Sequence, residues 1–184
     1  MPTTRLAFLF LAAGLSLAAT ASLADGLKFL PALDAGFKAE PTLALTAGVM
    51  NAAAAKDDAI GVYGIDFNMN CGLIQTPDNR IRTHVQLNHV NQSGVKATSV
   101  ELSPRYTLPL GGGFSFGVGP ALAYVNADTP AGDKNLFGYG AAAGFNFRKG
   151  MYYSGLDVRY LNTNERDRVQ FENWTFGIKV GVNF

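Results

Sequence analysis

The sequence has only one cysteine, Cys71, among its 184 residues. A single cysteine has no partner within the chain, so an intramolecular disulfide is excluded. Downstream of residue 24 the sequence also lacks any apolar run of about 20 residues, the length that a transmembrane helix requires. The fold must therefore form without a disulfide framework and without a helical membrane span.

Charged residues are also scarce, at 16% of the chain, whereas 48% of the residues are hydrophobic. This composition indicates a globular or membrane protein rather than a disordered chain. Without Arg5, which lies in the first 24 residues, 15 − 1 = 14 Lys and Arg residues face 14 Asp and Glu residues. A formally neutral chain offers no electrostatic attraction for nucleic acid, so we expect no nucleic-acid partner.

The first 24 residues, MPTTRLAFLFLAAGLSLAATASLA, have the composition of a secretory signal peptide. A positive charge at Arg5 precedes an apolar run that starts at Leu6, and small residues occupy the end of the segment. We expect cleavage after Ala24, with cleavage after Ala21 as the alternative. No cysteine stands at either cleavage position, so the pattern does not predict a lipid anchor.

The last eleven residues, WTFGIKVGVNF, alternate strictly between large apolar side chains and small or polar ones. This two-residue period is that of a β-strand with one apolar face, and a helix would not produce it. Two of the predicted strands contain a proline, Pro104 or Pro120, which removes a backbone donor, so we expect a bulge or a strand end at each. Alternation predicts eight strands in all, at about residues 37–50, 60–70, 80–90, 98–108, 114–125, 136–148, 151–161 and 174–184.

A soluble β-sandwich can show the same alternation, and the aromatic residues decide between the two architectures. If successive strands run in opposite directions, the aromatic residues of the apolar faces gather at two levels, with aliphatic and small residues between them. Such belts are typical of membrane β-barrels, because amphipathic rings settle at the headgroup level of a bilayer. The predicted belts contain Tyr106, Phe114, Phe116, Tyr124, Phe137, Tyr139, Phe145, Phe147, Tyr152 and Tyr160.

The connections between strands also have the asymmetry of an outer-membrane barrel, with polar loops on one side and short turns on the other. Two of the turns, LGGG and RKG, are tight, although CGLIQTPDN on the same side is longer than this rule expects. Closure of the sheet leaves no backbone group unpaired in lipid. We therefore predict an all-β protein, an eight-stranded antiparallel up-and-down transmembrane β-barrel at 37–184, preceded by a signal peptide at 1–24 and a periplasmic lead-in segment at 25–36, whose conformation the sequence does not predict.

The signal peptide, the eight amphipathic strands and the terminal GIKVGVNF together resemble the small OmpA/OmpX-type outer-membrane β-barrel family, whose members are also described as porin-like. The resemblance implies a multi-pass location in the cell outer membrane, contact with its lipid and lipopolysaccharide, and a monomer without a peptidoglycan-binding domain. It also implies that the barrel-assembly machinery recognises the last strand, through Trp174, Phe176, Ile178, Val180, Val182 and Phe184.

The inward positions carry charged residues on some strands and almost only Gly, Ala and Thr on others. Side chains just fill the interior of an eight-stranded barrel. Because buried charges persist only when they are paired, we expect an ion-pair network across the lumen. Its expected members are Arg82, Glu101 and Arg105 on one side and Asp157, Arg159 and Lys179 on the other, with Asp66 and His84 as additional members.

A lumen filled in this way predicts a structural protein of the cell surface, and two alternatives remain open. The barrel could form a narrow gated pore for ions or small solutes, or its polar loops, such as TNERDRVQ, could bind or adhere to partners. A lipid A deacylase is less favoured, because HVNQSG lacks the His-x-Ser-Asn pattern of those enzymes, although His84, Ser103 and Glu101 point inward on neighbouring strands. We therefore expect no enzyme activity.

We also expect no cofactor and no metal site. His84 and His89 are five residues apart on one strand, so their side chains lie on opposite faces and cannot share an ion. The glycine-rich stretches GYGAAAG and LGGGFSFGVG do not join a strand to a helix, as nucleotide-binding loops do.

Overall fold

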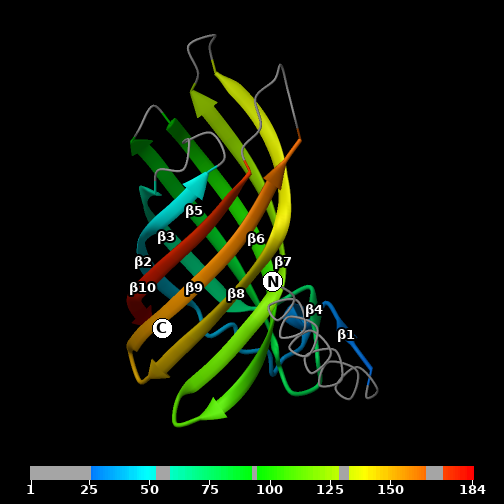
Figure 1. The fold of residues 1–184 in the computed structure, drawn as a ribbon. Helices are drawn as coiled ribbons and strands as arrows, with labels where there is room; N and C mark the ends of the chain where they lie inside the picture. Colours follow the sequence, from blue (N-terminus) through cyan, green and yellow to red (C-terminus); the bar gives the residue numbers. More distant parts are fainter. Residues whose placement is uncertain (1–25, 53–58, 93–94, 129–132, 165–171) are drawn as a thin grey trace, which may run out of the picture.

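The computed structural model describes residues 26–52, 59–92, 95–128, 133–164 and 172–184, so the expected signal peptide lies outside the described residues (Figure 1). Each long strand pairs with its neighbours in the antiparallel sense, and the last pairs with the first to close a barrel. The predicted eight-stranded up-and-down barrel is confirmed. Its strands are β2 (Thr42–Ala52), β3 (Ala59–Asn70), β5 (Ile81–Gln92), β6 (Val95–Gly111), β7 (Phe114–Asp128), β8 (Lys134–Lys149), β9 (Tyr152–Thr163) and β10 (Asn173–Asn183).

The barrel wall is apolar on its outer face and polar on its inner face, as β10 illustrates. Phe176, Ile178 and Val180 are 55%, 55% and 64% exposed, whereas Thr175 and Lys179 are each 2% exposed. Burying apolar surface away from water is worth roughly 25 cal/mol per Å², so an aqueous solvent would oppose this arrangement and lipid favours it. The outer face is therefore a lipid-facing surface. No helix in the described part of the chain is long and apolar enough to cross a membrane.

The first barrel strand begins at Thr42, five residues later than its expected start at Phe37. Glu40 has a φ of 46°, which an extended strand does not allow. Residues before this point therefore leave the wall and pass along the lower mouth of the barrel, where the Ala39 carbonyl accepts a hydrogen bond from the Asn70 N–H at 2.8 Å.

Pro104 in β6 and Pro120 in β7 lie inside paired strands, and the expectation of a bulge or strand end at each is wrong. The register of β6 against β7 is the same on both sides of them and sets the two prolines directly opposite each other. Neither proline has an N–H to donate to the carbonyl of the other, so the pairing of β6 with β7 is interrupted at this point. Pro104 stays paired with β5, and Pro120 stays paired with β8. The Ser103 hydroxyl donates to the Pro120 carbonyl at 2.9 Å. One shared interruption thus accommodates both prolines.

The lead-in and the long connection between β3 and β5 form a small second sheet beside the barrel (Figure 1). β1 (Lys28–Phe29) pairs with β4 (Ile74–Gln75), and a 3₁₀ turn, η1 (Pro31–Leu33), follows β1. The buried Gln75 side chain fixes this sheet to β5, because it donates to the Ile81 carbonyl at 2.8 Å and accepts from the Ile81 N–H at 2.6 Å. We call residues 27–33 and 73–75 the rim sheet. Its formation accounts for the unusual length of the CGLIQTPDN connection.

Candidate functional site

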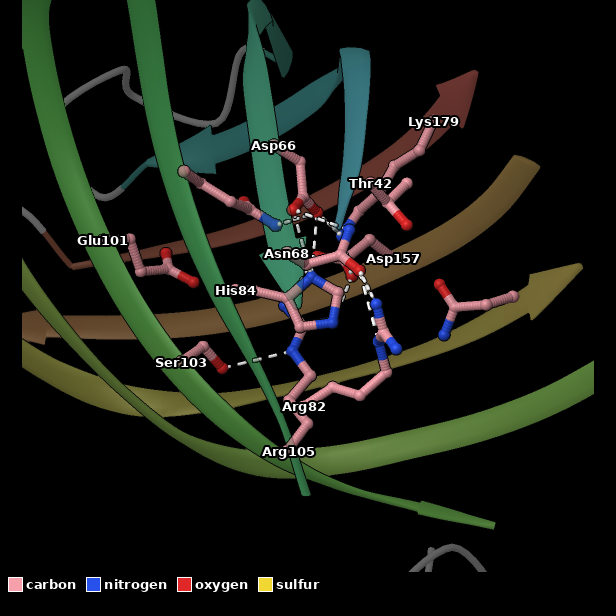
Figure 2. A network of polar contacts seen from close by, with 12 residues as sticks. Thr42, Asp66, Asn68, Arg82, His84, Glu101, Ser103, Arg105, Asp157 and Lys179 are labelled. Carbon is pink, nitrogen blue, oxygen red and sulfur yellow. Dashed lines mark hydrogen bonds and ion pairs between the residues drawn. The ribbon is translucent and has the colours of Figure 1, made fainter. Parts of the chain in front are cut away.

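The charged side chains that face the lumen meet at mid-height in the barrel (Figure 2). Small inward residues on β2, β7 and β8, such as Gly48, Gly117 and Gly144, leave room for long side chains from the other strands. The eight residues expected in the network are all at most 8% exposed, and they are Asp66, Arg82, His84, Glu101, Arg105, Asp157, Arg159 and Lys179.

Asp66 on β3 is the acceptor at the centre of one half of the network. Its carboxylate accepts hydrogen bonds from His84 Nδ1 at 3.0 Å, Gln86 Nε2 at 3.1 Å and Asn68 Nδ2 at 3.2 Å. Lys179 Nζ reaches the same carboxylate from β10. Asp66 is completely buried, and Lys179 is the one Lys or Arg side chain that pairs with it among the described residues. The charge of Asp66 therefore depends on Lys179.

Asp157 on β9 is the centre of the other half. Arg105 binds it through two N–H groups, at 2.5 and 3.4 Å, and Lys179 Nζ lies 2.9 Å from its Oδ1 atom. Arg159 Nε lies 3.5 Å from Oδ2 of Asp157, and Arg159 Nη1 donates to Glu101 at 3.2 Å. Lys179 and Arg159 thus each bridge two carboxylates, and the network ties β3, β6, β9 and β10 together across the lumen.

Arg82 lies apart from these ion pairs, contrary to the sequence-based expectation. Its guanidinium donates to the side chains of Asn68 and Asn70 and, at 2.7 Å, to the Glu40 carbonyl, and the Glu40 carboxylate is 3.7 Å away. Arg82 is the first inward residue of β5, and its side chain extends to the lower mouth and to the residues just before β2. Arg82 thereby holds the segment just before β2 at that mouth.

Further lumen side chains take part that the sequence pattern did not single out. Gln86 accepts a hydrogen bond from Arg159 at 2.6 Å. Arg148 on β8 donates to Asn68 at 2.5 Å, and its guanidinium carbon lies 5.0 Å from the centre of the Tyr153 ring, a cation–π distance. Strand parity alone indicates that these residues point inward, but it does not show which side chains they reach.

Above the charged network the lumen contains a cluster of apolar side chains, which the sequence reasoning did not anticipate, and the buried Thr175 and Asn173 are polar residues at the same level. The side chains come from the loop-side halves of seven strands, and each is at most 6% exposed. We call this group the upper apolar layer. It consists of Met50, Ile60, Val62, Val90, Ala97, Ala123, Val125, Ala127, Leu136 and Leu161.

A small cavity of about 10 Å³ lies between the charged network and the upper apolar layer. Two of its lining residues, Asn88 and Glu101, carry buried oxygen atoms, Oδ1 and Oε1, that have no hydrogen-bond partner among the described residues. A volume of this size matches a single water molecule, which can donate to both oxygens. The cavity is too small for a solute to pass through it.

The possible His84, Ser103 and Glu101 triad does not assemble. His84 binds Asp66, and Glu101 binds Arg159. Ser103 faces His84 across the β5–β6 register, but its hydroxyl donates to a backbone carbonyl and accepts from Arg105 Nε at 3.1 Å. No group of three or more His, Cys, Asp or Glu side chains in the described part of the chain is placed to hold a metal ion.

The residues of the predicted aromatic belts lie on the outer face, and none of the ten is buried. Neighbouring rings pack in tilted pairs at both levels, with centroid distances of 4.8 Å for Phe114 and Phe147 and 5.0 Å for Tyr160 and Trp174. In β10, every apolar residue of the expected assembly signal from Trp174 to Val182 is also lipid-facing and at least 36% exposed, and the terminal Phe184 is 74% exposed.

No protein-family model matches the sequence, and no curated protein matches it. Among solved structures, the N-terminal β-barrel domain of Pseudomonas aeruginosa OprF aligns with a TM-score of 0.56 at 15% identity, over 80% of this chain and 100% of that domain. Neisserial surface protein A, NspA, aligns with a TM-score of 0.47 at 13% identity, over 76% of this chain and 94% of that one.

This chain has the fold of the small outer-membrane β-barrels of the OmpA/OmpX type. The OprF alignment carries that statement, and at this level of identity it describes the fold alone. The lipid-facing outer wall supplies the second observation. A closed barrel with such a wall is an integral outer-membrane protein that crosses the membrane with eight strands.

Proposed function

We propose that this protein has a structural and surface role in the outer membrane, as a closed barrel that holds its polar loops outside the cell. The observation that carries the proposal is the filling of the lumen at two successive levels, by the charged network and by the upper apolar layer. Two cavities in the described part of the lumen each measure about 10 Å³. Side chains at both levels block the path that a solute would have to take through the barrel.

The upper apolar layer opposes conduction more strongly than the charged network does. An ion that entered it would lose most of its hydration shell among apolar side chains, and apolar constrictions gate channels by excluding water. The fully buried Ile60, Val125 and Leu136 belong to this layer. A gated pore would require the layer and the ion pairs beneath it to rearrange together.

Planar-bilayer recordings test the proposal. We expect the wild-type barrel to insert without unitary conductance, and we expect openings only when both levels are altered, as in the variant Ile60→Ser/Leu136→Ser/Arg159→Ser, which makes the upper apolar layer polar and removes one side chain that bridges two carboxylates. Phe176→Leu on the outer wall is a matched control that leaves the lumen unchanged. Reproducible unitary currents from the wild-type protein would establish the alternative, a narrow pore for ions or small solutes.

The surface part of the proposal concerns loop segments that lie mainly outside the described residues, including most of TNERDRVQ. We propose that these loops meet partners, since outer loops of barrels are exposed while the wall is covered by lipid. Limited proteolysis of intact cells removes such loops and leaves the barrel. If binding of the cells to surfaces does not change after proteolysis, the loops have no adhesive role.

We further propose that the barrel is monomeric, contacts lipid and lipopolysaccharide, enters the membrane through the assembly machinery, and has no enzyme activity. The apolar outer wall supports the lipid contact. The engagement of His84 with Asp66 and of the Ser103 hydroxyl with the Pro120 carbonyl supports the last point. Mass spectra of lipid A from cells with and without the protein should be identical. A change in acylation would show an activity that the lumen geometry does not explain.

A further inference from the structure

The rim sheet exposes apolar side chains outside the barrel wall. Phe29 is 72% exposed, Leu33 82% and Leu73 68%, and Leu27, Leu30 and Ile74 are also exposed. A two-stranded sheet of this size has no core of its own, so these side chains are not left over from internal packing. Exposed apolar clusters of this kind mark a surface that binds protein or membrane.

The rest of the described chain indicates which of the two applies. Large apolar side chains with comparable exposure occur on the lipid-facing wall, for example Leu45 at 70% and Phe184 at 74%, and in the lower turns at Leu110 and Met151. Outside the wall and those turns, the rim sheet alone presents such side chains among the described residues. Its surface therefore has the character of the lipid-facing surface.

The rim sheet is also continuous with that surface along the chain. β3 ends at Asn70, with Phe67 on the lipid-facing side, and Leu73 follows only three residues later. The Cys71 N–H donates to the Ile81 carbonyl at 2.8 Å, and the Leu30 N–H donates to the Leu73 carbonyl at the same distance. These hydrogen bonds attach the rim sheet to the lower rim of the barrel, between β3 and β5.

The position of the rim sheet relative to the barrel completes the argument. In Figure 1, β1 and β4 lie to one side of the barrel, at about the height of the C-terminus and above the turn that joins β6 and β7. That is the level at which the lower aromatic belt meets the bilayer surface. The outer edges of a two-stranded sheet also need water, which the headgroup region supplies and the hydrocarbon core does not.

We propose that the rim sheet is a membrane-interface anchor, which inserts Phe29, Leu33 and Leu73 into the headgroup region of the leaflet on the side of the chain termini. Lys28 lies between Leu27 and Phe29, and a lysine at this depth extends its ammonium group to the phosphates while its stem stays in the apolar layer. The partner is the phospholipid surface itself, and the anchor fixes the lead-in beside the barrel.

Tryptophan fluorescence tests this proposal on the full barrel in phospholipid vesicles. The single Trp174 is first replaced in Trp174→Phe, and a reporter is then introduced as Phe29→Trp, at a site exposed enough to accept the larger ring. Leu45→Trp on the wall is the matched lipid-facing control. We expect blue-shifted emission at position 29, loss of most of its intensity in vesicles of lipids brominated near the headgroup, and little quenching by aqueous iodide. An electrophoretic shift of the unboiled protein verifies that each variant is folded.

Two results would overturn the proposal. Strong quenching by iodide together with no response to brominated lipid would place position 29 in water. Shielding that appears only at high protein-to-lipid ratio would show that a second copy of the barrel, and not the bilayer, covers the rim sheet. As a further check, Phe29→Ser/Leu33→Ser should make the lead-in accessible to protease added on that side, whereas a rim sheet that lies in water would be cleaved equally in both proteins.

Discussion

Removal of the Lys179 charge is the sharpest test of the lumen network. Lys179 is 2% exposed and contacts both Asp66 and Asp157. Lys179→Met keeps an unbranched side chain that is one atom shorter, and Asp157 retains Arg105 and Arg159 as cationic partners. Asp66 retains only hydrogen bonds from His84, Gln86 and Asn68.

The expected loss in the free energy of unfolding is about 3–5 kcal/mol, the usual cost of leaving one member of a buried ion pair without its partner. Asp66 is 0% exposed, so water does not screen the uncompensated carboxylate. Urea titration of the barrel in lipid vesicles measures the change. Fluorescence of Trp174, which is 48% exposed on the lipid-facing wall, reports the loss of the bilayer environment.

The double variant Lys179→Met/Asp66→Asn distinguishes a lost ion pair from a general packing defect. If the orphaned carboxylate causes the loss, the second substitution removes it, and the double variant is more stable than Lys179→Met alone. The expected coupling energy is about 0.5–3 kcal/mol, the range found for residues in contact. Strict additivity of the two single losses would refute the reasoning, because it would mean that Lys179 and Asp66 act independently.

Three further predictions concern the wall and its assembly. Pro104→Ala/Pro120→Ala restores the two missing donors, so the new amides should exchange slowly with deuterium in lipid, and rapid exchange would show that the strands are separated there. A Cβ added at Gly48 would lie 2.2 Å from a carbonyl oxygen of the neighbouring strand, whereas a Cβ added at its register partner Gly177 would have its nearest such oxygen at 3.4 Å. Gly48→Ala should therefore lower the free energy of unfolding, measured in urea, by about 1–3 kcal/mol more than Gly177→Ala. Phe184→Ala should refold normally in detergent yet reach the outer membrane of cells in lower amount, as immunoblots of membrane fractions would show; equal amounts would exclude a role in recognition.

The barrel itself could be predicted because lipid on one face of each strand and a polar lumen on the other impose a regular pattern on the sequence. A strand between lipid and a polar lumen must alternate at every residue, and β10 does so from Trp174 to its end. The strand ends were predicted less well, because they depend on single residues. The positive φ of Glu40 delays the start of β2. The missing N–H groups of Pro104 and Pro120 suggested a break in both β6 and β7, but the register sets the two prolines opposite each other, so both strands continue.

The candidate site was harder to predict than the wall. Parity indicated which residues face the lumen, but contacts across the barrel also depend on the direction in which each long side chain extends. Arg82 and Arg105 are direct register partners, yet Arg105 reaches Asp157 while Arg82 reaches the lead-in. The rim sheet was not predicted at all, because its two-residue strands are too short to show a period.

The distribution of polarity along the lumen limits where this protein can meet its partners. The two layers of the lumen oppose the passage of ions for different reasons. An incoming ion would have to break the matched ion pairs of the charged layer, and in the upper layer it would meet mostly apolar side chains. The outer wall is occupied by lipid. Contact with other molecules is therefore confined to the two ends of the barrel, to the loops on one side and to the lower mouth on the other. Because residues 38–40 lie along that mouth, where Arg82 donates to the Glu40 carbonyl, a ligand that approaches from the side of the chain termini meets this segment before it meets the lumen.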